Sequence, residues 1–155
     1  MMDSLMGALM RPVVRAQMGN KVPFAKACGV RFESMGDGVA TCSLAEKAEL
    51  LDEHGHAHAG AVFTLAETCS GGAMAGGFAS VILKVRPVAA QVQFKVLNPS
   101  QGRLTAHARV DADIAAVKAE LHKVGKVNFP VQVEVKDARG GTTATMTVLW
   151  NLKKN

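Results

Sequence analysis

A run of small and apolar residues from Ala61 to Gly77 most narrowly limits how this chain can fold. Alanine and glycine are frequent in it, which suits a helix that is buried on nearly every side and packed closely against backbone. The Gly76-Gly77 pair marks its end. Between Ala57 and Leu83 only His58 and Glu67 could carry a charge. The sequence therefore predicts one long buried helix in the middle of the chain.

The same low charge raises the alternative of a membrane-spanning helix. Alanine and glycine contribute little transfer free energy, and a central Glu67 would be costly in lipid. The chain also offers no second apolar segment of this length and no flanking aromatic belt. We therefore expect no membrane span.

Segments with the character of β-strands lie on both sides of this helix. Val30 to Ser34 and Val39 to Leu44 predict a hairpin, joined by a glycine-containing turn at 35–38. Alternating apolar residues predict further antiparallel strands at Val88–Leu97, Leu104–Val110, Val124–Lys136 and Thr142–Leu152. The segment Ala112 to His122 fits either a helix or a strand. This order predicts an α+β fold with an antiparallel sheet of about five or six strands.

The first residues predict a helix that covers this domain. Apolar residues recur at helical spacing between Met1 and Gly19: Met2, Leu5, Met6, Leu9, Met10, Val13, Val14 and Met18. The segment lacks the positive start of a signal peptide, and Arg11-Pro12 interrupts its apolar stretch. A membrane-surface helix is the alternative, but few cations accompany the apolar residues. We expect one domain over 1–155, with 1–28 as an N-terminal helical cover and 29–155 as the core.

The cysteine content indicates the cell compartment, and the net charge indicates the kind of partner. The three cysteines are far apart in sequence and form no CxxC pair, which fits a reducing cytoplasm. The formal net charge of +5 and the pI near 9.3 favour an anionic partner. With no Tyr, one Trp and scattered Phe, the chain lacks the aromatic platform of single-strand binders. We therefore expect no nucleic acid partner, and a phosphorylated small molecule remains a candidate.

Glu67 is the most informative single residue because unpaired buried carboxylates are rare and costly. It could pair with an Arg or Lys of the sheet, or it could point outward. Alternatively it is a general base or a nucleophile whose pKa is tuned by partial burial.

The start of the helix offers a second candidate feature. Amides of Ala59 and Gly60 at a helix N-terminus could hold a carbonyl oxygen as negative charge develops on it, although a plain glycine-containing loop is the simpler interpretation. His54, His56 and His58 alternate, as zinc ligands on an extended segment would. Solvated loop histidines explain this pattern equally well, and no fourth ligand is evident, so we expect no metal.

The segment from Asp52 to Glu67 resembles the signature of hotdog-fold thioesterases of the phenylacetyl-CoA thioesterase type. In that signature an Asn, then a Gly, then His-Gly-Gly open the central helix, and an Asp or Glu follows within it. The resemblance extends more weakly to the strands and covers roughly Val30 to Leu149. It implies a hotdog fold, in which a long central helix is wrapped by an antiparallel sheet.

Carried over position by position, the resemblance implies site residues in this chain. His58 matches the motif histidine, Ala59 and Gly60 match the glycine pair whose amides form an oxyanion hole, and Glu67 matches the catalytic acid. Asp52 stands where the motif has Asn, and its charge would repel an attacking anion. Residues near these positions are expected to contact the substrate: Gly55, Thr64, Thr68, Ser70 and Gly71.

The resemblance implies hydrolysis of an acyl-CoA thioester to free acid and CoA, with CoA as part of the substrate and no further cofactor. Ala59 and Glu67 are about eight residues apart, which separates them by roughly 12 Å along one helix. We therefore expect a homodimer in which two antiparallel helices share each site, and a dimer of dimers is left open. The alternatives are a non-enzymatic acyl-CoA or lipid-binding hotdog protein and a hotdog dehydratase or hydratase.

Overall fold

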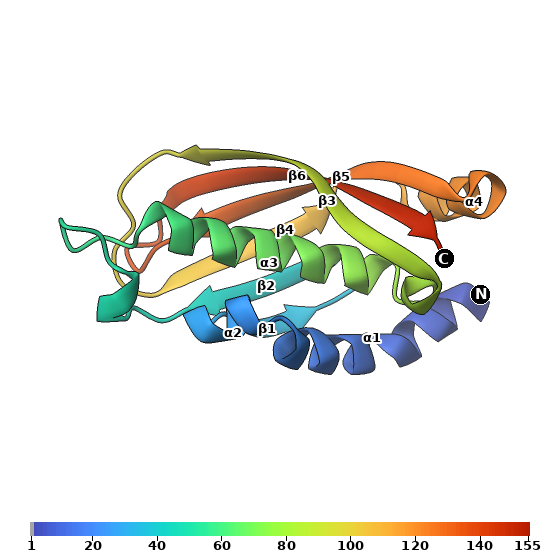
Figure 1. Cartoon of the computed structure of the whole chain (residues 1–155), viewed down its shortest axis with the longest axis horizontal. Helices are drawn as coiled ribbons and strands as arrows, with labels where there is room; N and C mark the ends of the chain where they lie inside the picture. Colours follow the sequence, from blue (N-terminus) through green and yellow to red (C-terminus); the bar gives the residue numbers. More distant parts are fainter. Residues whose placement is uncertain (1) are drawn as a thin grey trace.

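Six antiparallel strands form one sheet that curves around a long helix, α3 (Ala59–Gly77), in the computed structural model (Figure 1). The structure describes residues 2–155. In the sheet order β1-β2-β4-β5-β6-β3, the strands are β1 (Arg31–Met35), β2 (Val39–Leu44), β4 (Leu104–Val110), β5 (Lys126–Lys136), β6 (Thr142–Lys154) and β3 (Val85–Val96). The other elements are α1 (Met2–Lys21), α2 (Pro23–Cys28), α4 (Ile114–Val124) and two 3-10 turns, η1 (Ala48–Leu50) and η2 (Ile82–Lys84).

The predicted central helix is confirmed, and its glycines explain how closely it packs. A Cβ on Gly76 would clash with the carbonyl oxygen of Gly36 in the β1–β2 turn, and a Cβ on Gly72 would clash with the Phe32 ring. Larger side chains at these positions would push the helix off the hairpin. The small residues therefore let α3 lie directly on the sheet.

Strand alternation also predicts the core correctly. The side chains of β5 that point to α3 are all buried: Val127, Phe129, Val131, Val133 and Val135. Phe129 stacks on Phe78, just after α3, with ring centroids 4.6 Å apart. One face of the sheet thus packs on the helix, and the α+β architecture is confirmed.

The segment left open between helix and strand is a helix, α4. Its N-cap residue Asp113 accepts a hydrogen bond from the Ala116 amide at 3.1 Å, and Gly125 ends it with a positive φ of 88°. The short helix α2 was not predicted from the sequence. It has Pro23 at its first position, where the missing N–H costs no helical hydrogen bond.

Helix α1 continues through Pro12 and packs one face on the domain. Val14 is buried, Met10 and Met18 are partly buried against the core, and Arg11 donates to the Gly76 carbonyl at 3.1 Å. The predicted N-terminal helix is thus confirmed, although only one of its faces is covered. Within residues 2–155, no helix combines the length and the hydropathy that crossing a bilayer would require.

Candidate active site

Glu67 lies in the middle of α3, on the one flank of this helix that the protomer leaves partly open. Only Phe63 and Glu67 are half-buried after the first turn of α3, and the rest of the helix is buried. Within residues 2–155, no side chain forms an ion pair or hydrogen bond with the Glu67 carboxylate. Burial raises its pKa above the ordinary value of 4.5. A structural ion pair within the chain therefore does not explain this carboxylate.

Apolar groups on the neighbouring turns explain why Glu67 is desolvated. One turn earlier, the Phe63 ring meets Phe94 of β3 edge to face, with centroids 5.4 Å apart. One turn later, a Cβ on Gly71 would touch Met18 of α1 and Trp150 of β6 at 3.4 and 3.5 Å. Apolar groups thus lie beside the turns of α3 that precede and follow Glu67.

A buried hydrogen-bond chain fixes the turn that carries Glu67. The Ser70 hydroxyl donates to the backbone carbonyl of Glu67 at 2.6 Å, and the Trp150 indole N–H donates to the same hydroxyl at 3.2 Å. Ser70 is fully buried. The link holds this part of α3 in one position over β6.

Four of the expected substrate contacts lie inside the protomer. Thr64, Thr68, Ser70 and Gly71 are all buried, and the Thr64 hydroxyl donates to the Gly60 carbonyl at 2.8 Å. A contact between any of them and a substrate stays a prediction. Their visible role is to seat α3 on its neighbours.

The first turn of α3 presents one open amide. His58 is the N-cap, and its Nδ1 accepts a hydrogen bond from the Gly60 amide at 2.9 Å. The Ala59 amide has no acceptor among residues 2–155, and Ala59 is exposed. The Gly60 amide could bind a carbonyl only after releasing His58, so Ala59 is the donor that stands ready at the positive end of the helix.

Asp52 organises the loop that leads into α3. Its Oδ1 accepts hydrogen bonds from the His54 and His56 amides at 2.8 and 3.0 Å, and Gly55 takes a positive φ of 79° at the tip. The bond from His56, followed by that from His54, lowers the pKa of the Asp52 carboxyl. Asp52 therefore stays ionised at neutral pH and supports the loop backbone.

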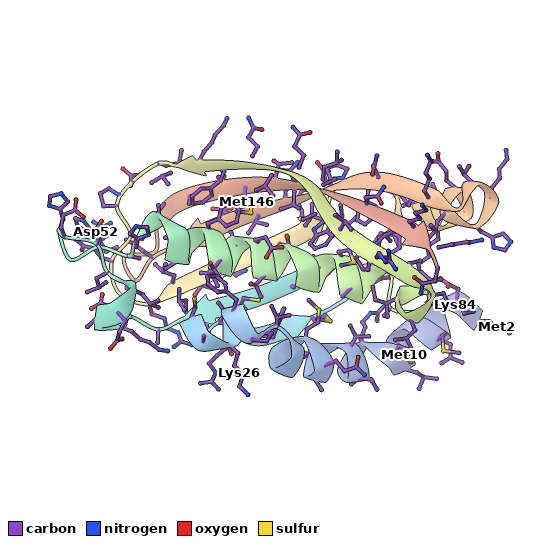
Figure 2. The ribbon with its side chains drawn as sticks, in the orientation of Figure 1. Met2, Met10, Lys26, Asp52, Lys84 and Met146 are labelled. Carbon is purple, nitrogen blue, oxygen red and sulfur yellow. The ribbon has the colours of Figure 1, made fainter. Side chains whose placement is uncertain are left out.

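Asp52 and Ala59 border the same cleft of about 380 Å³. The cleft lies at the N-terminal end of α3, where Figure 2 labels Asp52. The sequence predicted only a turn at Asn98 to Gly102, but part of this connection also borders the cleft. The remaining lining residues are His54, His56, Ala57, Val62, Val96, Leu97, Asn98, Pro99, Ser100 and Ala144.

For the thioester hydrolysis that the family resemblance implies, we expect the substitution Asp52→Asn to raise kcat by roughly three- to tenfold. The Asn oxygen can still accept both loop amides, and the change removes an anion from the cleft in which negative charge would develop. Steady-state kinetics of the two proteins would measure this. Asp52→Ala is the matched control, because it removes the charge and also the loop acceptor, and it should lower the melting temperature. An Asn variant slower than wild type would show that the carboxylate itself takes part.

One protomer alone does not bring the two candidate groups together. The Ala59 amide and Glu67 remain roughly 12 Å apart along α3. Among residues 2–155, no three His, Cys, Asp or Glu side chains lie close enough together to hold a metal ion.

A family model described as a domain of unknown function, DUF4442, matches residues 10–152. No curated protein matches the chain. Solved structures do match: PA5026 of Pseudomonas aeruginosa, named a probable thioesterase, is 24% identical with a TM-score of 0.79, covering 93% of this chain and 95% of its own. The PaaI protein of the Escherichia coli phenylacetic acid degradation operon is 22% identical with a TM-score of 0.67, covering 96% and 98%.

A thioesterase family protein from Silicibacter pomeroyi is 19% identical with a TM-score of 0.74, covering 91% of this chain and 99% of its own. Each of these alignments spans more than nine tenths of both chains. The predicted hotdog architecture is thereby confirmed. The chain belongs to the DUF4442 family and has the fold of the hotdog thioesterases.

Proposed function

We propose that this protein is a thioesterase that hydrolyses acyl-CoA to the free acid and CoA. The unpaired, half-buried carboxylate of Glu67, with its raised pKa, is the observation that carries this proposal. A protein gains no stability from such a group, so a catalytic use accounts for it. The thioesterase names of the structural neighbours support the same class of reaction.

The proposed reaction uses two groups from different protomers: the Ala59 amide at the start of one α3 helix and Glu67 in the middle of the other. The thioester carbonyl oxygen accepts a hydrogen bond from the Ala59 amide of one protomer, where the helix dipole favours the developing negative charge. Glu67 of the other protomer takes a proton from water as the water oxygen attacks the carbonyl carbon. The C–S bond then breaks, and the proton passes from Glu67 to the departing CoA sulfur. Direct attack by Glu67 is the variant with a covalent anhydride intermediate.

The sheet offers a contact that could bring two protomers together. β3 is an edge strand of 12 residues that pairs only with β6 among the described strands. Its other edge carries unpaired backbone groups, which another strand can complete. Two copies joined at β3 across a two-fold axis would place their α3 helices antiparallel, with Ala59 of each near Glu67 of the other. The open flank of α3 and the open edge of β3 therefore support a homodimer.

A non-enzymatic acyl-CoA-binding protein is the second candidate. Two observations favour it: the ionised Asp52 beside the cleft, and the bond that engages the Gly60 amide. Both would weaken stabilisation of an oxyanion without preventing binding.

We expect the purified protein to release free thiol from acyl-CoA substrates in a panel of aryl-acetyl and of short, medium and long aliphatic thioesters. The half-buried carboxylate supplies the base, and the open Ala59 amide supplies the oxyanion donor. The measurement is the thiol release rate at each substrate concentration. Binding of acyl-CoA by calorimetry without thiol release above the buffer rate would favour the binding protein instead.

A further inference from the structure

Helix α1 carries apolar side chains on its outer side as well as on the side that packs on the domain. Thirteen large hydrophobic side chains are exposed among the described residues, and seven of them lie in the first 24 residues. Five of these share one side of α1, at spacings of three and four residues. We call them the outer stripe: Met2, Leu5, Met6, Leu9 and Val13, which are 47 to 86% exposed.

The charged residues of α1 whose side chains are described point to the domain instead. Arg11 donates to the Gly76 carbonyl and forms an ion pair with Asp37. Arg15 donates to two carbonyls of β1 at 2.8 and 3.0 Å. Asp3 accepts from Lys118 at 2.6 Å. These polar bonds and the buried Val14 thus hold α1 on the body of the protein, while the outer stripe faces away from it.

A stripe of this size marks a binding surface rather than scattered exposure. The largest contiguous apolar patch on a typical monomeric protein measures roughly 300 to 600 Å² and is often functional. The outer stripe extends from Met2 to Val13, so it runs along roughly 17 Å of the helix surface. The exposed Phe24 of α2 adds a further large side chain near the end of α1. Taking roughly 60 to 100 Å² of apolar surface per side chain, the five residues of the stripe present about 300 to 500 Å², roughly half of the ~800 Å² per partner of a standard interface.

We propose that the outer stripe of α1 binds the outer stripe of a second copy of this chain. A two-fold interface requires the same patch on both partners, and one uncharged helix side provides a self-complementary patch with no like charges opposed. Leu and Met at spacings of three and four form the ridges that pack between antiparallel helices. This contact is separate from the β3 edge, so the two together give a dimer of dimers.

A lipid surface is the competing occupant, and the charge distribution disfavours it. A helix that lies in the membrane interface combines its apolar side with a face rich in Lys and Arg, and it often carries Trp or Phe in the apolar side. The stripe itself has no aromatic residue, and both arginines of α1 are bonded to the domain.

The test compares the full chain with the double substitution Leu5→Glu/Leu9→Glu by light scattering after size exclusion. Both side chains are exposed in the protomer, so the fold should persist, as circular dichroism would verify. We expect the wild type at the mass of four chains and the variant at half that mass. Leu5→Ala/Leu9→Ala should shift the same equilibrium toward smaller species without added charge. The control Val124→Glu, on exposed α4 surface, should keep the wild-type mass.

Equal masses for the wild type and Leu5→Glu/Leu9→Glu would overturn the proposal. A second result would also overturn the proposal. In it, the wild type has the mass of two chains and cosediments with phosphatidylcholine–phosphatidylserine vesicles, whereas Leu5→Glu/Leu9→Glu does not cosediment. The thioesterase proposal is tested separately, because thiol release depends on the β3 contact and should persist in the stripe variant. If Leu5→Glu/Leu9→Glu has half the wild-type mass and neither protein releases thiol, this inference stands and the proposed function is rejected.

Discussion

The substitution Glu67→Gln is expected to lower kcat by roughly 10² or more, with little change in substrate binding or fold. Gln keeps the shape of the side chain but cannot accept the proton from water. Steady-state kinetics on the best thioester of the panel would measure the loss. The matched control is Glu120→Gln on the exposed surface of α4, which should leave kcat unchanged.

The same carboxylate sets the pH dependence. Because burial raises the pKa of Glu67, the acidic limb of the kcat/KM profile should lie above the ordinary value of 4.5, and the rate should rise as the carboxylate ionises. The limb should disappear in the Gln variant. A wild-type rate in Glu67→Gln would remove the carboxylate from the mechanism.

Stability should respond in the opposite sense to activity. A carboxyl whose pKa is raised by folding holds its proton more tightly in the folded state, so the stability it adds is present below the unfolded pKa and is lost as the pH rises through the folded pKa. The ionised form of Glu67 therefore costs stability relative to the protonated form. We expect Glu67→Gln to melt at the same or a higher temperature at pH 7. A large drop in the melting temperature would indicate a partner charge left unpaired.

Mixing two inactive variants is expected to restore activity if each site is shared between chains. Ala59→Pro removes the open amide, and proline is tolerated at the first helical position after His58, whose ψ of 140° suits a residue before proline. Loss of this donor should lower kcat by roughly 10² to 10³. A mixed dimer of Ala59→Pro and Glu67→Gln has one site with both lesions and one site with none.

After dissociation and reassociation of an equimolar mixture, about a quarter of the wild-type activity should return, because half of the dimers are mixed and each has one intact site. Each variant refolded alone is the control and should stay inactive. Failure of the mixture to recover activity, with mixed dimers shown by mass spectrometry, would mean that each site lies within one chain.

The fold could be predicted from the sequence to a large extent because its strongest signals are periodic. The alternation of Val127 to Val135 and the small residues of α3 each permit few arrangements, and both are confirmed. Helix α4 stayed ambiguous because its alanines satisfy helix and strand patterns alike. Short α2 has too few residues for a period to be visible.

Local capping bonds could not be predicted in the same way. The sequence indicated amides at Ala59 and Gly60, but the bond between Gly60 and His58 depends on how the preceding loop turns. Asp52 was interpreted through the family motif, whereas its Oδ1 holds the His54 and His56 amides. An Asp followed three residues later by Gly is a recognisable signal for such a turn. The exposure of the outer stripe also needed the structure, because helical spacing does not tell which apolar residues face the domain.

The unpaired edge of β3 also bears on how the protein behaves when it is dilute or partly unfolded. An isolated protomer presents a long row of unsatisfied amides and carbonyls beside exposed valines, Val88 and Val96. Such an edge recruits strands indiscriminately, so separated chains should aggregate irreversibly. Heat inactivation should then become faster as the proposed dimer dissociates, and loss of soluble protein rather than loss of catalysis would limit the lifetime of a stored sample.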